Sequence, residues 1–175
     1  MNRRATNPDR SLLALFALLL LTFVPAASSF AQTASETESP GPVRSRGQTI
    51  YTPIYSHIFF GDAPAPFNLT STLSIRNTDR SHAIQVVSAS YHDSDGRLIR
   101  EYLPNPVLLA PLASTNCLVP ESDTAGGIGA SFIVRWRSAI PVDAPLVEAV
   151  MIGTRGQQGI SFISRGQVLS ANPDS

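Results

Sequence analysis

Lysine is absent from this chain of 175 residues, in which all 13 basic side chains are arginine. A P-loop has the pattern GxxxxGK[ST], in which the lysine contacts the nucleotide phosphates, so that class of site is excluded. The glycine-rich stretch 151–162, MIGTRGQQGISF, has GxxGxxG spacing and continues with residues typical of strands. A dinucleotide fingerprint needs GxGxxG before a helix, so it is excluded as well. We interpret the stretch as a hairpin turn, Thr154–Gln158, whose glycines supply backbone freedom and whose tip either binds a ligand or does not.

Cysteine is nearly absent too, because Cys117 is the only one in the chain. A single cysteine cannot form an internal disulfide, so the fold must depend on its hydrophobic core even in an oxidising compartment. A domain of about 120 residues buries roughly two-thirds of its unfolded surface, which is enough for such a core. We expect Cys117 to be a small, buried, apolar residue of that core.

Hydrophobic runs long enough to cross a membrane are missing. The longest run, Leu12–Val24, has 13 residues, whereas a spanning helix needs about 20. Three arginines precede this run, Pro25 ends it, and Ser29-Phe30-Ala31 supplies small residues for cleavage. Residues 1–31 are therefore predicted to be a secretion signal peptide, which places the protein in the periplasm or outside the cell. A retained membrane anchor is the alternative, but no stop-transfer pattern follows.

An excess of charge of one sign is also lacking. The whole chain has 13 basic and 13 acidic residues, and the part after residue 31 keeps 10 and 12. Nucleic-acid binding demands a basic footprint, so nucleic acid is not an expected partner. We expect neither electrostatic attraction to a membrane surface nor stable membrane insertion once the signal is removed.

The part of the chain after the signal divides by composition. Residues 32–47 are polar and contain proline and glycine, so they are predicted to be a flexible leader. The folded domain is expected at residues 48–169, followed by a frayed tail at 170–175.

Within this domain the apolar residues recur with a period of two, which is typical of half-buried strands. Three sets are each expected to share one face: Phe67, Leu69, Leu73 and Ile75; Val87, Ala89 and Tyr91; and Phe132, Val134 and Trp136. Asp95-Gly96 predicts a hairpin turn. Residues Tyr51–Phe60 are predicted to form a strand rich in aromatic side chains. The pattern predicts an all-β fold, an immunoglobulin-like antiparallel β-sandwich of about 8–9 short strands, with Trp136 on a central strand.

Two polar connections are candidates for a binding site. The segment 121–127 precedes the Trp136 strand, and the turn 154–158 comes two connections later. Successive connections in a sandwich usually alternate between its two ends, so both segments should lie at the same end. We predict a shared binding rim there, because loops on a rigid scaffold commonly carry function. Its residues are Glu121, Asp123, Arg155, Gln157 and Gln158. Arg135 and Arg137, on the outward face of a strand, are either a second recognition stripe or solvated charges that protect the sheet.

Catalytic, metal and cofactor patterns are missing, so none is predicted. All three histidines precede Cys117, which does not fit a blue-copper site, and no close ligand pairs suit zinc. Asp93 and Asp95 lack the later ligands of a calcium loop, and no GxSxG elbow is present. His82 and His92 are expected at the solvated surface, and His57 partly buried.

Several blocks resemble a bacterial family known as domain of unknown function 3124. They are IYTPIYSHIFFGD (50–62), LTSTLSIRNTD (69–79), ESDTAGGIGASFIVRW (121–136) and VEAVMIGTRGQQGISFISRG (147–166). The resemblance covers nearly all of the chain after the leader. It implies a small exported domain with no assigned activity, so no catalytic residue can be transferred from it.

The leading hypothesis is an exported, non-enzymatic β-sandwich that binds a protein, peptide or glycan in the cell envelope through loop tips or a sheet edge. One alternative is a secreted enzyme in which Glu121 and Asp123 work with Arg155 or His57 in acid–base chemistry. Another is a purely structural component of the envelope.

Overall fold

The computed structural model describes residues 44–62 and 65–171. The chain divides into two compact units, Met1–Glu38 and Ser39–Ser175, and every described residue belongs to the second. The predicted signal peptide, residues 32–43 of the predicted leader and residues 172–175 of the predicted tail lie outside the described residues. The described residues form twelve strands and no helix, so the prediction of an all-β fold is confirmed, whereas the expected number of about 8–9 strands was too low.

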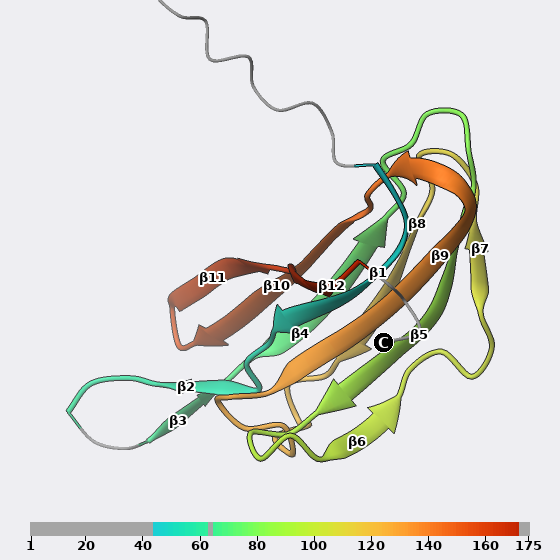
Figure 1. The fold of residues 1–175 in the computed structure, drawn as a ribbon. Coiled ribbons are helices and arrows are strands. Elements are labelled where there is room, and N and C mark those ends of the chain that lie inside the picture. The colour runs from blue at the N-terminus through green and yellow to red at the C-terminus, as the bar shows by residue number, and fades with distance from the viewer. Residues whose placement is uncertain (1–43, 63–64, 172–175) are drawn as a thin grey trace, which may run out of the picture. The chain divides into compact units, whose positions relative to one another are not determined.

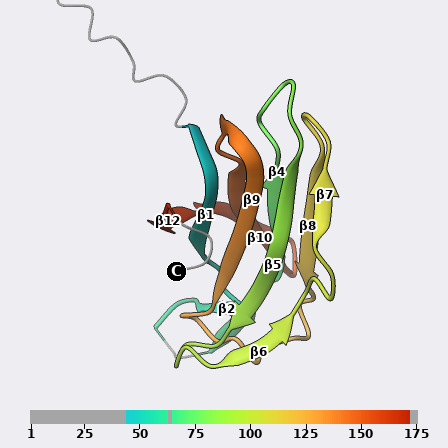
Figure 2. The ribbon, with the colours of Figure 1, turned by 45° about the vertical axis from the view of Figure 1, so that its right-hand side comes forward.

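Two antiparallel sheets account for ten of the strands. The larger has the order β12-β1-β9-β5-β6, with β7 also paired to β5; the smaller has the order β11-β10-β4-β8. The larger sheet contains β1 (Arg44–Pro53), β5 (Ile84–His92), β6 (Leu98–Glu101), β7 (Val107–Leu109), β9 (Ser131–Asp143) and β12 (Gln167–Ser170). The smaller contains β4 (Thr70–Arg76), β8 (Ser114–Val119), β10 (Leu146–Arg155) and β11 (Gln158–Arg165). A separate hairpin pairs β2 (His57–Phe59) with β3 (Pro66–Asn68), and Figures 1 and 2 show these strands.

The two sheets pack face to face around one hydrophobic cluster. Figure 2 shows β1, β9 and β5 in front of β4 and β10. Phe132 and Trp136 come from the larger sheet and Leu73 and Met151 from the smaller, and all four are fully buried. β9 lies between β1 and β5, so Trp136 is on a central strand as predicted. Its indole Nε1–H donates to Gln48 Oε1 at 3.3 Å, which satisfies the only polar group of the ring.

The alternation predicted for β9 is confirmed, and Leu69, Leu73 and Ile75 are fully buried as expected. Phe67, expected on the same strand, lies instead on β3 and is only half-buried. The prediction for β5 is also wrong in one position. Ala89 and Tyr91 are fully buried as expected, whereas Val87 is only half-buried, and Ile84 and Val86 are buried instead. The pairing of β5 with β9 shifts register between Val86 and Ser88. A bulge inserts one extra residue, so the inward-facing positions change from even to odd along the strand.

The start of the domain also differs from the expectation. β1 begins at Arg44, inside the segment that composition assigned to the leader, because Arg44 and Ser45 pair with Asp143 and Val142 of β9. The expected single strand Tyr51–Phe60 is divided between β1 and β2. The N–H groups of Ile54 and Ser56 donate to Ala130 O and Gly127 O, in the loop before β9. This bonding ends β1 after Pro53 and lets the β2–β3 hairpin leave the sheet.

Cys117 lies on β8, is 3 % exposed and belongs to the hydrophobic cluster, as predicted. Burial raises the pKa of its thiol to about 11, and the negative charge of Glu101 adds to this effect. Removal from water disfavours the charged thiolate. Cys117 is therefore a packed thiol and not a reactive one.

Candidate functional site

A cavity of about 450 Å³ lies between the β2–β3 hairpin and the β10–β11 turn. Figure 1 shows the hairpin and the turn at the same end of the smaller sheet. The lining residues come from both elements: Ile58, Phe60, Phe67, Arg155, Gln158, Gly159 and Ile160. Two of the five predicted rim residues, Arg155 and Gln158, are among them. A cavity of this size, apolar with a few polar groups, is typical of ligand sites.

Two glycines build this end of the molecule in different ways. Gly156 has φ +63° and is the first of the two residues that join β10 to β11. Glycine at that position with positive φ fits a type II′ turn, whose twist matches the flanking strands. The sequence had suggested that the glycines of this stretch supply backbone freedom. Gly153 has a different role. A Cβ there would collide with the Phe67 ring, Asn68 O and Leu69 Cδ2, so this glycine lets β3 pack on β10.

The walls of the cavity are apolar and open to solvent, while its polar groups lie on the turn. Phe60 is 64 % exposed and Ile160 is 41 % exposed. Arg155 and Gln158 pair with each other across the end of the β10–β11 hairpin. Within the described ranges no carboxylate is in ion-pair contact with Arg155. The arrangement can hold an apolar group and, beside it, a negative or hydrogen-bond-accepting group.

The rim predicted from the sequence is divided in space. Val119 at the end of β8 and Met151 of β10 both pair with Ser71, so the two loops leave the smaller sheet at the same end. Asp123, however, lines a separate depression with Ile99 and Arg100. Glu121 and Gln157 are exposed and line neither this depression nor the cavity at the turn.

Asp123 is already engaged by its own surroundings. Its Oδ2 lies 3.5 Å from Arg100 Nη2, and its Oδ1 accepts the N–H of Ala125 at 3.2 Å. Arg100 also donates to Tyr102 Oη at 3.2 Å. The carboxylate is therefore paired with Arg100 of β6, not with Arg155 or His57 as the enzymatic alternative supposed.

The glycines of the segment 121–127 hold that segment in place. A Cβ on Gly126 would collide with Tyr91 Oη, and one on Gly127 would press on Ser94 Oγ. The Ser94 hydroxyl donates to Gly126 O at 3.0 Å and accepts the N–H of Gly129 at 2.9 Å. These contacts fix the segment to the β5–β6 turn, and the close approach of Tyr91 and Ser94 leaves no room for a Cβ at Gly126 or Gly127.

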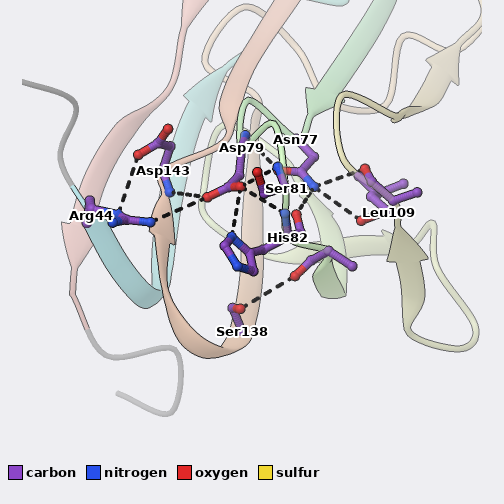
Figure 3. Close-up of polar contacts among 10 residues, drawn as sticks. Arg44, Asn77, Asp79, Ser81, His82, Leu109, Ser138 and Asp143 are labelled. Carbon is purple, nitrogen blue, oxygen red and sulfur yellow. Dashed lines mark hydrogen bonds and ion pairs between the residues drawn. The ribbon is translucent and has the colours of Figure 1, made fainter.

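The most highly bonded polar cluster was not predicted from the sequence, and it follows β4 (Figure 3). The Asn77 amide donates to three carbonyls, those of His82 at 2.8 Å, Ala110 at 2.9 Å and Leu109 at 3.2 Å. Its Oδ1 accepts the N–H of Asp79 at 3.0 Å. Asn77 thereby joins the end of β4 to the β7–β8 turn. The only sequence signal is a run of Asn, Thr, Asp and Ser after a strand, which is typical of side chains that bond nearby backbone.

Asp79 is the charged centre of this cluster and is 3 % exposed. Its carboxylate accepts the N–H groups of Ser81 at 2.8 Å, His82 at 2.9 Å and Asp143 at 3.2 Å. Led by the bond from Ser81 N–H, these donors hold the pKa of Asp79 far below its usual range against the opposing effect of burial. His82 is not simply solvated, because its Nδ1 lies 3.1 Å from Asp79 Oδ1.

The remaining histidines have local contacts. His57 is partly buried as expected, and its ring packs edge-on against Phe59 with centroids 5.6 Å apart. His92 Nδ1 lies 3.1 Å from Gly96 O, at the β5–β6 turn. In the part of the chain that the structure describes, no three His, Cys, Asp or Glu side chains are grouped so as to hold a metal ion. That part also contains no helix long and apolar enough to cross a membrane.

Comparison with known proteins gives a family but no activity. No curated protein matches this chain. One solved structure, described as "Crystal Structure of Thermotoga maritima 1070", matches with 12 % identity and a TM-score of 0.41 over 69 % of this chain and 92 % of that chain. The family model "Protein of unknown function (DUF3124)" matches residues 47–169. This chain therefore belongs to the DUF3124 family, as the sequence blocks had indicated.

Proposed function

We propose that this protein is an exported, non-enzymatic binding module that captures an extended segment of another protein in the cell envelope. The segment would add a strand to β11 and place an apolar side chain in the cavity beside the β10–β11 turn. The observation that carries the proposal is that the cavity opens directly next to an edge strand. Gln158, Gly159 and Ile160 are the first residues of β11 and also line the cavity.

β11 has the properties of a strand that accepts a partner. It is at the end of the smaller sheet and pairs with β10 over eight consecutive residue pairs without a register shift. Natural edge strands are commonly protected by bulges, prolines or charges. β11 has no bulge and no proline, and its single charge, Arg165, is its last residue. The free edge is thus a regular template for main-chain hydrogen bonds.

The far end of β11 limits the length of the partner. The Ser164 hydroxyl donates to Pro53 O of β1, and Gly166 packs against Ile50 and Thr52. The chain then continues as β12 on the larger sheet. The accessible part of the edge is therefore residues 158–163, and its first half adjoins the cavity.

The chemistry of the cavity favours a peptide over a glycan. Ile58, Phe60 and Ile160 offer apolar walls, and among the described residues no carboxylate forms an ion pair with Arg155. A segment with an aliphatic or aromatic anchor next to an acidic residue would match both features.

The proposed module is an immunoglobulin-like sandwich that is exported and loses its signal peptide. N-terminal sequencing of the protein from producing cells should begin near Gln32, and an intact residue 1 would contradict export by cleavage.

Selection from a displayed library of random peptides would test the binding mode. Selected peptides should contain the apolar–acidic pair and should slow hydrogen exchange in β11 more than in β8, the opposite edge strand. Ile160→Ser should weaken their binding about tenfold, because about 1–2 kcal/mol of apolar contact is lost.

Ile163→Ser is the matched control. Ile163 is on the same strand and is 59 % exposed, but it pairs with Val150 on the outer face and does not line the cavity. Its substitution should change affinity less than twofold. Equal losses for the two variants, or bound peptides that leave β11 exchange unchanged, would reject strand addition at this edge.

A further inference from the structure

A second depression, with a volume of about 670 Å³, lies at the other end of β4, beside the turn that leads into β5. Ser81, His82, Leu108, Arg137, Ser138 and Ile140 are among its lining residues. They come from the β4–β5 turn, β7 and the second half of β9. We call this depression the Arg137 groove.

The charged group of the groove is held in place but not neutralised. Arg137 Nε donates to Gln85 Oε1 at 2.8 Å, and Gln85 pairs with Arg137 across β5 and β9. Fixing Nε orients the guanidinium plane and leaves its terminal NH₂ groups for another acceptor. Among the ion pairs of the described residues none contains Arg137. Of the two outward arginines of β9, only Arg137 lines the groove.

None of the described residues that line the groove is acidic. Asp79 is two residues before Ser81, which lines the groove. The Asp79 carboxylate is buried and accepts three backbone N–H groups, as Figure 3 shows. Arg44 lies between Asp79 and Asp143, at 3.9 Å and 3.7 Å from their carboxylates. Both carboxylates are therefore already compensated. Arg137 is the arginine among the described residues that line the groove, and no acidic residue of that lining opposes it.

Hydroxyl groups and aliphatic side chains complete the lining. In Figure 3 the His82 imidazole lies between Asp79 and Ser138. The Ser138 hydroxyl donates to Ala83 O at 3.5 Å, a distance so long that a ligand acceptor would compete readily for it. Leu108 is 70 % exposed and Ile140 is 42 % exposed on the groove walls. Such a set offers hydrogen-bond donors beside an apolar surface.

We propose that the Arg137 groove is a second ligand site, for a small organic anion that carries an aliphatic chain. The carboxylate or phosphate of the ligand binds the terminal NH₂ groups of Arg137, with the Ser138 hydroxyl as a second donor. The chain of the ligand covers Leu108 and Ile140. This site is distinct from the β11 edge, and neither proposal depends on the other.

Isothermal titration calorimetry of the purified chain tests the site with octyl phosphate, octanoate, octanol and inorganic phosphate. Octyl phosphate or octanoate should bind saturably, and the better of the two identifies the preferred headgroup. Octanol and inorganic phosphate should bind at least tenfold more weakly, because each lacks one half of the recognised chemistry. Binding of octanol or inorganic phosphate as tight as that of the better anion would overturn the proposal, and so would a failure of both anions to bind saturably.

Matched arginine variants locate the binding. Arg137→Gln should weaken binding of the preferred anion about tenfold or more, since it removes the charge-assisted hydrogen bonds to the headgroup. Arg135→Gln removes the same charge two residues away on the same face and should change affinity less than twofold. Leu108→Ser should weaken binding of the octyl ligand but not of inorganic phosphate. Equal losses from the two arginine variants would show diffuse attraction and would reject the groove as a site. Thermal unfolding of each variant confirms that it is folded.

Discussion

The carboxylate of Asp79 contacts the imidazole of His82, with Asp79 Oδ1 at 3.1 Å from His82 Nδ1. Asp79 is almost fully buried, whereas 42 % of the His82 side chain is exposed. The contact therefore joins the charged centre of the β4–β5 turn to the wall of the Arg137 groove. The pKa of Asp79 is held low mainly by the N–H of Ser81, with the N–H groups of Asp143 and His82 adding to the effect and the His82 ring contributing least.

Replacement of Asp79 should make stability depend less on pH. The folded-state pKa of Asp79 is lowered, so its contribution to stability is fully present above the unfolded pKa of about 4 and is lost as pH falls toward the folded value. Asp79→Asn should lower the midpoint of urea unfolding at pH 7. The gap between this variant and the unmodified protein should narrow steadily below about pH 4.

Asp95→Asn is a suitable control for that measurement. Among the described residues the Asp95 carboxylate pairs with Arg97 alone, at the surface, and 67 % of the Asp95 side chain is exposed. Surface pairs contribute little, so its unfolding midpoint should follow that of the unmodified protein at each pH. A gap for Asp79→Asn that stays constant from pH 7 to pH 3 would contradict the assigned role of the charge.

The layers of the fold were predictable from sequence, because alternation depends only on which residues avoid water. Phe132, Val134 and Trp136 illustrate this, since all three are fully buried on one face of β9. The alternation failed at Val87, where the bulge between Val86 and Ser88 changes the inward phase. Both phases of that segment contain apolar residues, so the sequence of β5 alone does not reveal the bulge.

The candidate site was predicted in part, because turn chemistry is local and close packing is not. Gly156 could be assigned to a hairpin turn from its neighbours. The role of Gly153 depends on Phe67, which lies far away in the chain. Likewise Asp123 appeared free for a rim until the structure placed Arg100 of β6 beside it. Pairings between distant segments decide which polar side chains remain available to a ligand.

Gly153→Ala should destabilise the end of the sandwich that holds the cavity. Its new Cβ would overlap the Phe67 ring and the backbone oxygen of Asn68. Overpacking of this kind typically costs about 1–3 kcal/mol, which urea unfolding would measure. Gly159→Ala is the control, because a Cβ there meets nothing closer than 3.8 Å. Equal stability of the two variants would show that β3 does not pack on Gly153 as described.

Cys117 should be inert toward thiol reagents while the protein is folded. The thiol is 3 % exposed and its pKa is raised to about 11, so little thiolate is present at pH 8 and little of it is accessible. Ellman's reagent should label the protein slowly in buffer and at once in denaturing urea. Rapid labelling of the folded protein would place Cys117 outside the core.

Trp136 gives a direct optical test of the packed sheets, because it is the only tryptophan of the chain. Its side chain is fully buried. Its emission should be blue-shifted in the folded protein, weakly quenched by acrylamide, and shifted to longer wavelength on unfolding. Emission at the wavelength of the unfolded chain would contradict a core built around β9.

Combined replacement of Arg155 and Gln157 by alanine should weaken binding of the peptides selected on this protein. The melting temperature should stay almost unchanged, because both side chains are exposed. Arg155 lines the cavity and Gln157 does not, so Arg155→Ala alone should account for nearly all of the loss. The guanidinium would contact the acidic group of the peptide, and removal of a charge-assisted contact of this kind typically costs about 1.5–3 kcal/mol. Fluorescence anisotropy of a labelled peptide measures the three variants side by side. Undiminished binding by the double variant, or a loss that arises from Gln157→Ala alone, would remove Arg155 from the binding site.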